Sequence, residues 1–187
     1  MAHLTRYCMY RTISEHFPEG MTGKILGISG IEGFHPLIDM HRCEVTETAY
    51  PAVDMQQLPY GEGVFDCVIS DQVIEHVKDP QTAVSESYRV LKRGGTAIHT
   101  TCFMNHIHPD PVDLWRFTPD GLRYLCRDFS RIVSCDGWGN RGAIFLCFLS
   151  RRLRYMEIPE TKWSLRHFIA TYNEERVPIV TWIIAKK

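Results

Sequence analysis

The chain has 187 residues, with 21 Lys and Arg against 22 Asp and Glu, and 44% of its residues are apolar. This length suits one domain with its own hydrophobic core, and the net charge of −1 excludes an overall basic surface for nucleic acid or anionic membranes, so binding to either requires a local patch. No apolar run approaches the ~18 residues of a membrane span, and residues 1–10 lack the apolar centre of a secretory signal. We therefore expect one cytoplasmic domain over residues 1–187 that binds neither nucleic acid nor membrane.

The first predicted elements are a helix and a buried strand. Apolar residues recur at helical spacing over Tyr7–Phe17 and stop at Pro18, which predicts a covering helix within residues 1–22. The apolar run Lys24–Ser29 follows and is closed by Gly30. Because this run lacks polar alternation, it is typical of a strand buried on both faces, as in a parallel sheet.

The middle of the chain predicts a βαβ unit. Phe65–Ser70 is a second buried-strand run, and Asp79 with Pro80 supplies a helix N-cap followed by proline at the first helical position. Two adjacent glycines then stop the helix, and Thr96–Phe103 is the next strand. A strand, a capped helix and another strand in this order form a unit whose crossover is right-handed.

The last part of the chain adds further helices and strands. Thr118 and Pro119 cap another helix, Arg131–Cys135 is a strand, and Val180–Ala185 is the final strand. The mixed segment Arg151–Tyr172 is predicted to be helical in two pieces. This alternation predicts an α/β fold, with an open sheet and helices on both faces.

In such folds ligands bind beyond the carboxyl ends of the strands, so the residues that follow each strand are the first candidates for a site. The glycines of Gly27–Gly33 let a ligand approach the backbone, although a tight turn explains them equally well. Glu47 follows the predicted strand Arg42–Thr46, where its carboxylate either accepts hydrogen bonds from ribose hydroxyls or faces solvent. The Asp54 carboxylate either binds the amino edge of an adenine or forms an Asx-turn with the backbone that follows it. The polar run Asp71–Val77 contains two acids, an amide and an imidazole. This is a high density of polar side chains for a connecting loop and favours a functional role.

Three motifs lie in order along the chain: L-P-x5-F-D from Leu58, E-H-V-x-D-P from Glu75 and R-V-L-K-x-G-G from Arg89. In this order and spacing they resemble the core of the class I S-adenosylmethionine-dependent methyltransferases of the small-molecule type. Two further segments are similar to parts of the same family. His108–Pro119 resembles the segment after the fifth strand in one subgroup, and Val177–Lys187 resembles the final antiparallel strand.

The resemblance implies a Rossmann-like sheet of seven strands, mostly parallel, with helices on both faces and an antiparallel last strand. It also implies a cofactor-binding core over residues 24–135, a substrate-side segment with the final strand over residues 136–187, and S-adenosyl-L-methionine as the cofactor, released as S-adenosyl-L-homocysteine. The chain from Gly30 to Asp54 is short for the first crossover and the second strand, because a βαβ unit usually takes ~30 residues or more. We therefore expect a compressed first crossover.

The resemblance further implies which residues contact the cofactor. Gly27, Ser29 and Gly30 would face the methionine moiety, and Glu47 would bind the ribose. Asp54 and Met55 would border the adenine, and Ser70 and Gln72 would lie on the sulfonium side. One departure from the family is that Gly27 stands where an acid is usual, and that Ser29 and Ile31 interrupt the usual glycine pattern. Glu32 is either a substitute for the acid or a side chain that faces solvent.

The acceptor side follows from the chemistry of methyl transfer. Displacement from a sulfonium needs alignment of the acceptor with the methyl group, and a base is needed only if the acceptor must lose a proton. In the family this role falls to the segment that borders the acceptor pocket, which makes the candidates His106, His108, Asp113 and Arg116. They could instead pin a loop over the sheet. A metal site of the two histidines with Asp110 and Asp113 is the least favoured alternative, because no further His or Cys cluster completes four ligands, and we predict no metal.

The sequence therefore predicts an enzyme that methylates a small molecule or a glycan or sugar precursor by in-line transfer. The alternative is a non-catalytic member of the fold, whose altered first loop has lost the cofactor and which serves as a binding or scaffold module. The cationic run of Arg151, Arg152 and Arg154 is typical of a solvated helix face, or else recruits an acidic substrate such as a sugar nucleotide. The near-neutral charge argues against a nucleic-acid substrate.

Overall fold

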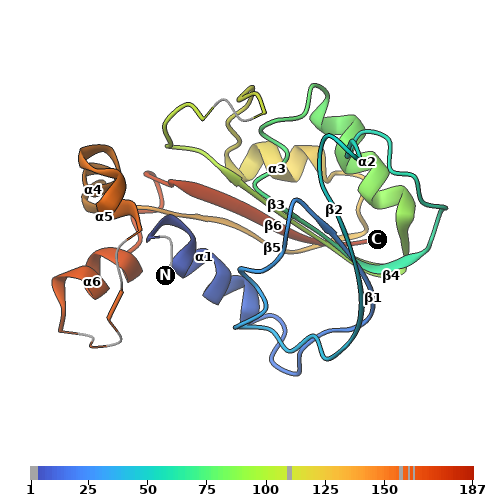
Figure 1. The fold of residues 1–187 in the computed structure, drawn as a ribbon, viewed down its shortest axis with the longest axis horizontal. Coiled ribbons are helices and arrows are strands. Elements are labelled where there is room, and N and C mark those ends of the chain that lie inside the picture. The colour runs from blue at the N-terminus through green and yellow to red at the C-terminus, as the bar shows by residue number, and fades with distance from the viewer. Residues whose placement is uncertain (1–3, 109–110, 156–157, 160, 162) are drawn as a thin grey trace.

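A six-stranded sheet lies at the centre of the molecule (Figure 1). The computed structural model describes residues 4–108, 111–155, 158–159, 161 and 163–187. The strands are β1 (Thr22–Ile28), β2 (Arg42–Thr48), β3 (Phe65–Asp71), β4 (Leu91–Cys102), β5 (Arg131–Trp138) and β6 (Val180–Lys186). They lie in the order β2-β1-β3-β4-β6-β5; the first four are parallel, and β6 is antiparallel to both of its neighbours. This confirms the predicted α/β fold, mostly parallel with an antiparallel last strand.

The helices of the described residues are α1 (Leu4–Ser14), α2 (Pro80–Val90), α3 (Pro119–Leu125), α4 (Arg141–Leu149), α5 (Arg151–Arg154) and α6 (Leu165–Thr171). The helix α2 joins β3 to β4 and completes the predicted βαβ unit. It begins on local signals, because the Asp79 carboxylate accepts hydrogen bonds from the backbone N–H groups of Gln81 and Thr82 at 3.1 and 3.2 Å, and Pro80 opens the helix. Within the described ranges, no helix combines the length and the apolar character needed to cross a bilayer.

The sheet has one strand fewer than the seven predicted, counting the described residues. Residues 49–64, between β2 and β3, run through turns and add no strand. Pro51 and Pro59 lie in this segment, and a proline cannot donate the backbone hydrogen bond that strand pairing needs. As a result β2 is the edge strand of the sheet.

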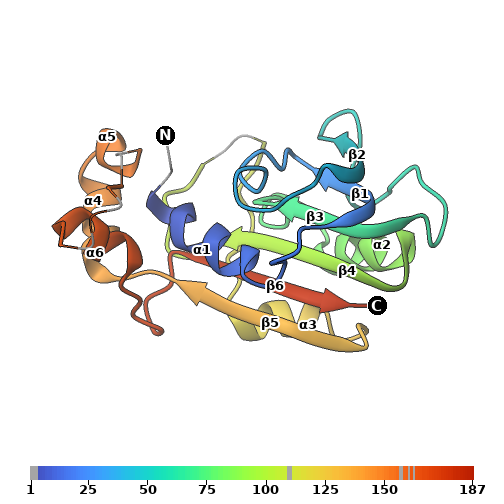
Figure 2. The same ribbon diagram turned by 90° about the horizontal axis from the view of Figure 1, so that it is seen from below.

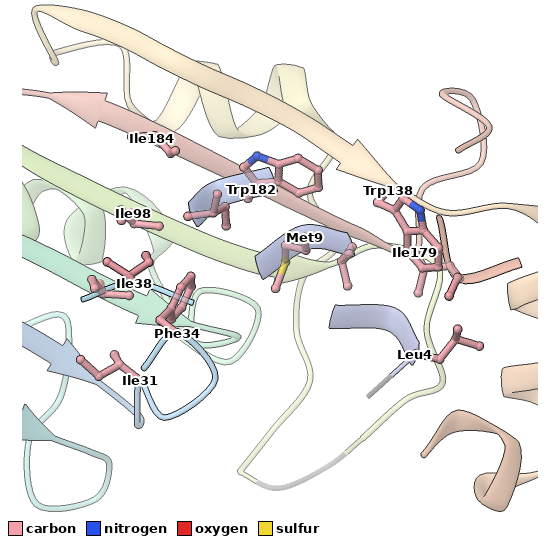
Figure 3. Packing of buried hydrophobic residues seen from close by; sticks show 14 of the residues in the cluster. Leu4, Met9, Ile31, Phe34, Ile38, Ile98, Trp138, Ile179, Trp182 and Ile184 are labelled. Carbon is pink, nitrogen blue, oxygen red and sulfur yellow. The ribbon is translucent and has the colours of Figure 1, made fainter. Parts of the chain in front are cut away.

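The first crossover is compressed, as predicted. Residues 29–41 connect β1 to β2 without a regular helix. Ile31, Phe34 and Ile38 of this segment are nevertheless buried, and they pack on the sheet in the place of a crossover helix (Figure 3). The shortened connection therefore keeps the apolar face that a helix would have supplied.

Two hydrophobic cores lie on opposite faces of the sheet, because successive strand residues point to opposite faces. The last strand shows the alternation. Trp182 and Ile184 join the cluster that contains Met9 of α1 (Figure 3), whereas Ile183 joins the cluster that contains residues of α2 and α3. Burial on both faces explains why the strand sequences are continuous apolar runs.

The helices α4, α5 and α6 gather at one end of the molecule, beyond the carboxyl end of β5 (Figures 1 and 2). Asn140 ties two of them together. Its Oδ1 accepts a hydrogen bond from the Ala143 N–H at 2.7 Å and so caps α4, and its Nδ2 donates to the Ile169 carbonyl of α6 at 2.8 Å. The two helical pieces predicted within Arg151–Tyr172 are confirmed as α5 and α6. The helix α4 was not predicted.

Candidate functional site

Two adjoining cavities open at the carboxyl edge of the parallel strands. The first has a volume of about 490 Å³ and the second of about 760 Å³. Ser29, Gln72 and His76 line both of them, so the cavities meet just after β1 and β3. This edge is where open parallel sheets bind their ligands.

Two residues at this junction hold the backbone in an unusual conformation. Ser29 has a φ of 68° and Gln72 has a φ of 57°, in the left-handed region that non-glycine residues rarely adopt. The neighbouring strands hold both turns: the Ser29 N–H donates to the Thr48 carbonyl at 2.7 Å, and the Gln72 N–H donates to the Thr100 carbonyl at 3.1 Å. Such strain costs on the order of 1–3 kcal/mol per residue and gathers at ligand sites. The conformation therefore points to a function at the junction.

The first cavity is lined by the loop after β2 and by apolar side chains. Asp54, predicted to border adenine, lines it and also forms an Asx-turn. Its carboxylate accepts hydrogen bonds from the Gln56 N–H at 2.8 Å and from the Gln56 side-chain amide at 3.0 Å. The Gln56 Oε1 accepts in turn from the Asp79 N–H at 2.7 Å, which fixes the loop to the start of α2. The apolar lining consists of Ile28, Val53, Met55, Val73, Val77 and Val112.

Sequence reasoning missed most of this apolar lining. Of its members only Met55 was predicted. Val77 and Val112 come from segments that are distant in the sequence, and Tyr50 with Pro51 lines the cavity from the loop after β2. Isolated apolar residues in loops carry no signal of their own, so only the fold identifies them.

Three residues predicted to contact the cofactor are not among the described residues that line these cavities. Gly27 lies in β1, where an added Cβ would come within 3.0 Å of Ile31, so the glycine lets the crossover fold back onto the sheet. Ser70 is fully buried, and its Oγ lies 2.7 Å from Nδ1 of His99. Glu47 is exposed near the end of the edge strand β2. Contact of these three with a cofactor remains a prediction.

Polar side chains from α1 and β3 meet in the wall of the second cavity. Asp71, the last residue of β3, accepts hydrogen bonds from the Tyr10 hydroxyl and, at 2.5 Å, from the Thr100 hydroxyl. The Arg6 guanidinium lies 3.6 Å from the same carboxylate. Burial, together with the Asp71 charge, raises the pKa of Tyr10, so the phenol keeps its proton and remains a donor. The polar run indicated Asp71 from the sequence, but only the fold brings Tyr10 and Arg6 to it.

His108 lines the second cavity and lies beside the ion pair of Asp113 and Arg116. Its Nδ1 lies 3.1 Å from the His106 carbonyl oxygen, with which it shares a hydrogen bond, and 3.2 Å from Oδ2 of Asp113, whose side chain is 1% exposed. Arg116 binds both oxygens of this carboxylate, with its Nη2 at 2.5 Å from Oδ2. Hydrogen bonding to Arg116 lowers the pKa of Asp113 to about 2, so the carboxylate stays ionised and fixes the imidazole ring. Three of the four predicted acceptor-side residues thus act as one unit.

His106, the fourth predicted acceptor-side residue, lies apart from this unit. Its ring stacks on Phe148 of α4, with the ring centroids 3.9 Å apart, and it is not among the described residues that line the two cavities. Asp110, which belonged to the metal alternative, lies outside the described residues. The structure therefore groups the acceptor-side candidates around His108.

A different set of donor atoms comes together beside His108. Single donor atoms of Glu75, His76 and His108 lie within 4.8 Å of one another. The His76 Nδ1 is 2.6 Å from the Val112 carbonyl, and the fully buried Glu75 accepts a hydrogen bond at Oε2 from the Thr101 hydroxyl at 2.9 Å. Burial raises the pKa of Glu75, which favours a protonated carboxyl. Because metal ligands must be deprotonated, this set suits proton exchange better than metal binding.

Comparison with known proteins starts with a family model. Residues 18–99 match the model described as "Methyltransferase domain". Among curated proteins, a 2-methyl-6-phytyl-1,4-hydroquinone methyltransferase of Oryza sativa subsp. japonica is 36% identical over 78 residues, which are 38% of this chain and 22% of that protein. Ajmaline N-methyltransferase of Rauvolfia serpentina is 32% identical over 65 residues, which are 35% of this chain and 21% of that protein. The chain spans about a fifth of the length of these relatives.

Solved structures share the fold over nearly the whole chain. A possible histamine N-methyltransferase of Thermotoga maritima superposes with a TM-score of 0.56 and 15% identity, covering 98% of this chain and 91% of that one. Phosphoethanolamine N-methyltransferase 2 of Haemonchus contortus, solved with S-adenosyl-L-methionine, has a TM-score of 0.58 and 17% identity, covering 97% of this chain and 52% of that one. The [4+2]-cyclase SpnF has a TM-score of 0.58 and 15% identity, covering 96% and 80%, so the shared fold does not by itself specify methyl transfer. The match over residues 18–99, the strand order and the three sequence motifs together make the chain similar to the class I S-adenosylmethionine-dependent methyltransferases, whose fold it shares.

Proposed function

We propose that the protein transfers a methyl group from S-adenosylmethionine to a small molecule, with a glycan or sugar precursor as one acceptor class. The observation that carries the proposal is the junction of two cavities at Ser29, Gln72 and His76. The first cavity suits the adenosine part of the cofactor and the second its methionine part together with an acceptor, so the methyl group is transferred close to the junction. Relatives named for a hydroquinone and for ajmaline support an acceptor of the small-molecule class.

The first cavity suits the adenosine part of the cofactor. Its volume of about 490 Å³ falls within the range of small-molecule sites, and its walls are mostly apolar, with few polar groups such as Asp54 to fix orientation. When bound, the cofactor supplies a methyl group that its sulfonium has already activated. Ser29 and Gly30 lie where the two cavities meet and face the methionine part in this proposal.

Glu32 takes the role of the missing acid in the first loop. It lines the second cavity, and its Oε2 lies 2.6 Å from the position of a Cβ built on Gly30, which places the carboxylate over the strained turn. A carboxylate there can accept a hydrogen bond from the ammonium group of the cofactor's methionine part.

Glu32→Gln should therefore weaken binding of S-adenosylmethionine about tenfold, because a hydrogen bond to a charged group contributes roughly 1.5–3 kcal/mol and this side chain is exposed. Calorimetry measures the affinity, with Glu44→Gln on the exposed edge strand as the control. Equal affinity of the two variants would remove Glu32 from the site.

Acceptor deprotonation falls to His108. An acceptor hydroxyl or thiol gives its proton to the His108 imidazole as the methyl group arrives, while the Asp113 carboxylate, 3.2 Å from Nδ1, stabilises the imidazolium that forms. Arg116 is a positioning residue, because both of its terminal nitrogens are engaged with Asp113. The second cavity places His108 on the same wall as Gln72 and His76, next to the junction.

A non-catalytic binding module is the second candidate, and the glycine at position 27 in place of the usual acid favours it. Calorimetry and thermal unfolding with S-adenosylmethionine and S-adenosylhomocysteine separate the two candidates, followed by transfer of labelled methyl to small-molecule extracts, RNA and protein. We expect heat, a thermal shift and label chiefly in the small-molecule fraction. The absence of both heat and a thermal shift at millimolar cofactor would overturn the proposal of an enzyme. Binding without transfer to any fraction would favour the binding module.

A further inference from the structure

The exposed large apolar side chains are concentrated at one end of the molecule. Of the 17 such side chains among the described residues, eight belong to residues 141–172 and five to residues 104–115. These segments contain α4, α5 and α6 and the loop after β4, which lie beyond the carboxyl ends of the strands (Figure 2). Single exposed apolar residues are normal on a soluble protein, but a gathering of this kind marks an interaction site.

Within this region the apolar residues form whole helix faces. On α4, Phe145, Phe148 and Leu149 are 64%, 50% and 62% exposed, at the i, i+3 and i+4 spacing of one face, whereas Ala143 and Cys147 on the opposite side are buried. The outward face of a helix in a soluble protein is normally polar. The helix α4 reverses this rule, since it carries no charged residue after Arg141.

The helix α6 and its approach continue the apolar surface. Leu165 and Phe168 are 72% and 55% exposed at i and i+3, and the buried Ala170 lies on the inner side. Trp163, just before the helix, is 97% exposed. We call Phe145, Phe148, Leu149, Trp163, Leu165 and Phe168 the distal apolar patch.

The same region has a net positive charge in a chain that is near neutral as a whole. Residues 141–172 contain six Lys and Arg against two Glu, whereas the whole chain has 21 against 22. Arg152 and Arg166 are exposed, and the Arg141 side chain is 82% exposed, with its Nε 3.5 Å from Oε2 of Glu174. Apolar and aromatic side chains flanked by arginines match the surface of an anionic bilayer, where the rings enter the headgroup region and the guanidinium groups meet lipid phosphates.

This charge also argues against a second copy of the chain as the occupant. A twofold dimer would bring the same surface of each copy together, and with it the same positive charges. Anionic lipid supplies the opposite charge and is therefore the complementary partner.

We propose that the distal apolar patch docks the protein on the surface of an anionic lipid bilayer, with α4 and α6 lying in the headgroup region. The patch lies at the carboxyl edge of the sheet that also holds both cavities. An acceptor that is itself amphiphilic then has a short route from the bilayer, and this consequence alone rests on the proposed function.

The test is flotation of the full chain with lipid vesicles, in the absence of cofactor and acceptor. Vesicles of phosphatidylcholine with phosphatidylglycerol should carry the protein up the gradient. Vesicles of phosphatidylcholine alone should carry at least fivefold less, because each basic residue near an anionic surface adds a factor of about five. High salt should weaken the binding to the mixed vesicles.

Substitutions at exposed positions locate the surface. Phe145→Ser with Leu149→Ser should lower flotation more than about tenfold through lost apolar burial, whereas Tyr124→Ser, 68% exposed on α3, should leave it unchanged. Arg152→Glu with Arg166→Glu should abolish the preference for anionic vesicles. The matched control is Arg93→Glu, near the amino end of β4.

Three results would overturn the proposal. The first is no flotation with either vesicle, and the second is equal flotation of the wild type and the Phe145→Ser, Leu149→Ser variant. The third is a dimer in analytical ultracentrifugation that this variant separates, which would assign the patch to a second copy. Thermal unfolding of each variant shows that it is folded. Calorimetry with S-adenosylmethionine tests the proposed function independently, because it uses no lipid.

Discussion

His108 lines the second cavity, with its Nδ1 3.2 Å from the Asp113 carboxylate and its Nε2 4.0 Å from the Glu75 carboxyl. If it accepts the acceptor's proton, His108→Gln should lower turnover by about 10²–10⁴-fold, the usual contribution of a positioned general base, and should leave the affinity for S-adenosylmethionine unchanged. The control is His16→Gln, at an exposed position away from both cavities. A His108→Gln variant that keeps its turnover would show that His108 only shapes the loop.

Substitution of Asp113 tests the same role of His108 more mildly, because the imidazole itself stays in place. Asp113→Asn keeps the shape of the side chain but removes the charge that holds the imidazole, so turnover should fall while cofactor affinity stays the same. This substitution also removes the ionic partner of Arg116, whose side chain is 26% exposed and keeps its hydrogen bond to the Trp115 carbonyl, so the fold should be destabilised by only about 1–2 kcal/mol. Denaturant unfolding measures this loss, and the kinetic comparison is made on protein shown to be folded.

His99 sets a pH dependence of stability. It is fully buried in β4, and burial lowers its pKa to about 4 from an ordinary value of 6.5. Between these pH values the unfolded chain binds a proton that the folded chain refuses, so stability should fall by roughly 3 kcal/mol as the pH drops from 6.5 to 4 and should be unaffected by His99 above that window. In His99→Gln this part of the loss should be absent. Parallel curves of unfolding free energy against pH for the two proteins would refute the assignment.

At the scale of elements, the position of α1 depends on a glycine in the first crossover. A Cβ on Gly33 would come within 2.5 Å of the Tyr10 ring, and Tyr10 is the residue of α1 that hydrogen-bonds Asp71. Gly33→Ala should therefore push α1 from its place and cost about 1–3 kcal/mol, the usual penalty of overpacking. In a Tyr10→Ala background the same substitution should cost far less, because the ring is gone.

A double-mutant cycle of these two substitutions by denaturant unfolding measures the coupling. Hydrogen exchange of the amides in Leu4–Ser14 shows whether the helix loosens. Additive effects of the two substitutions would mean that the crossover and α1 do not share this contact in solution.

At the scale of the whole molecule, removal of metal ions should change nothing. The donor set of Glu75, His76 and His108 contains a carboxyl whose pKa is raised by burial, which disfavours the ionised form that a metal needs, and the Glu75 Oε1 lies 4.0 Å from the His108 Nε2. Dialysis against a chelator should therefore leave the melting temperature and the affinity for S-adenosylmethionine unchanged. A lower melting temperature that zinc restores would instead show a structural metal at this set.

The order of the elements could be predicted from the sequence because their signals are local. The β3-α2-β4 unit follows from two apolar runs, the Asp79 cap and a glycine stop, all of which act within a few residues. The rule that ligands bind at carboxyl ends of strands pointed to the loops after the strands, and the resemblance named the contact residues within and beside them. The structure places Ser29, Asp54 and Gln72 on the two cavities, whereas Gly27, Glu47 and Ser70 are not among the described residues that line them. The seventh strand was wrong because it came from the family's pattern, whereas residues 49–64 are a short, proline-containing connection.

The sequence by itself determined the fold class, the compressed crossover and the edge of the sheet that carries the site, because apolar periodicity and capping groups bias the backbone before the chain packs. Only the tertiary structure decided which side chains meet at that edge. Tyr10 reaches Asp71 across 61 residues of sequence, and His108 rather than His106 faces the cavity, since loop side chains take their direction from the elements they pack against. The apolar outer faces of α4 and α6 likewise emerge only when packing shows which side of each helix is already covered.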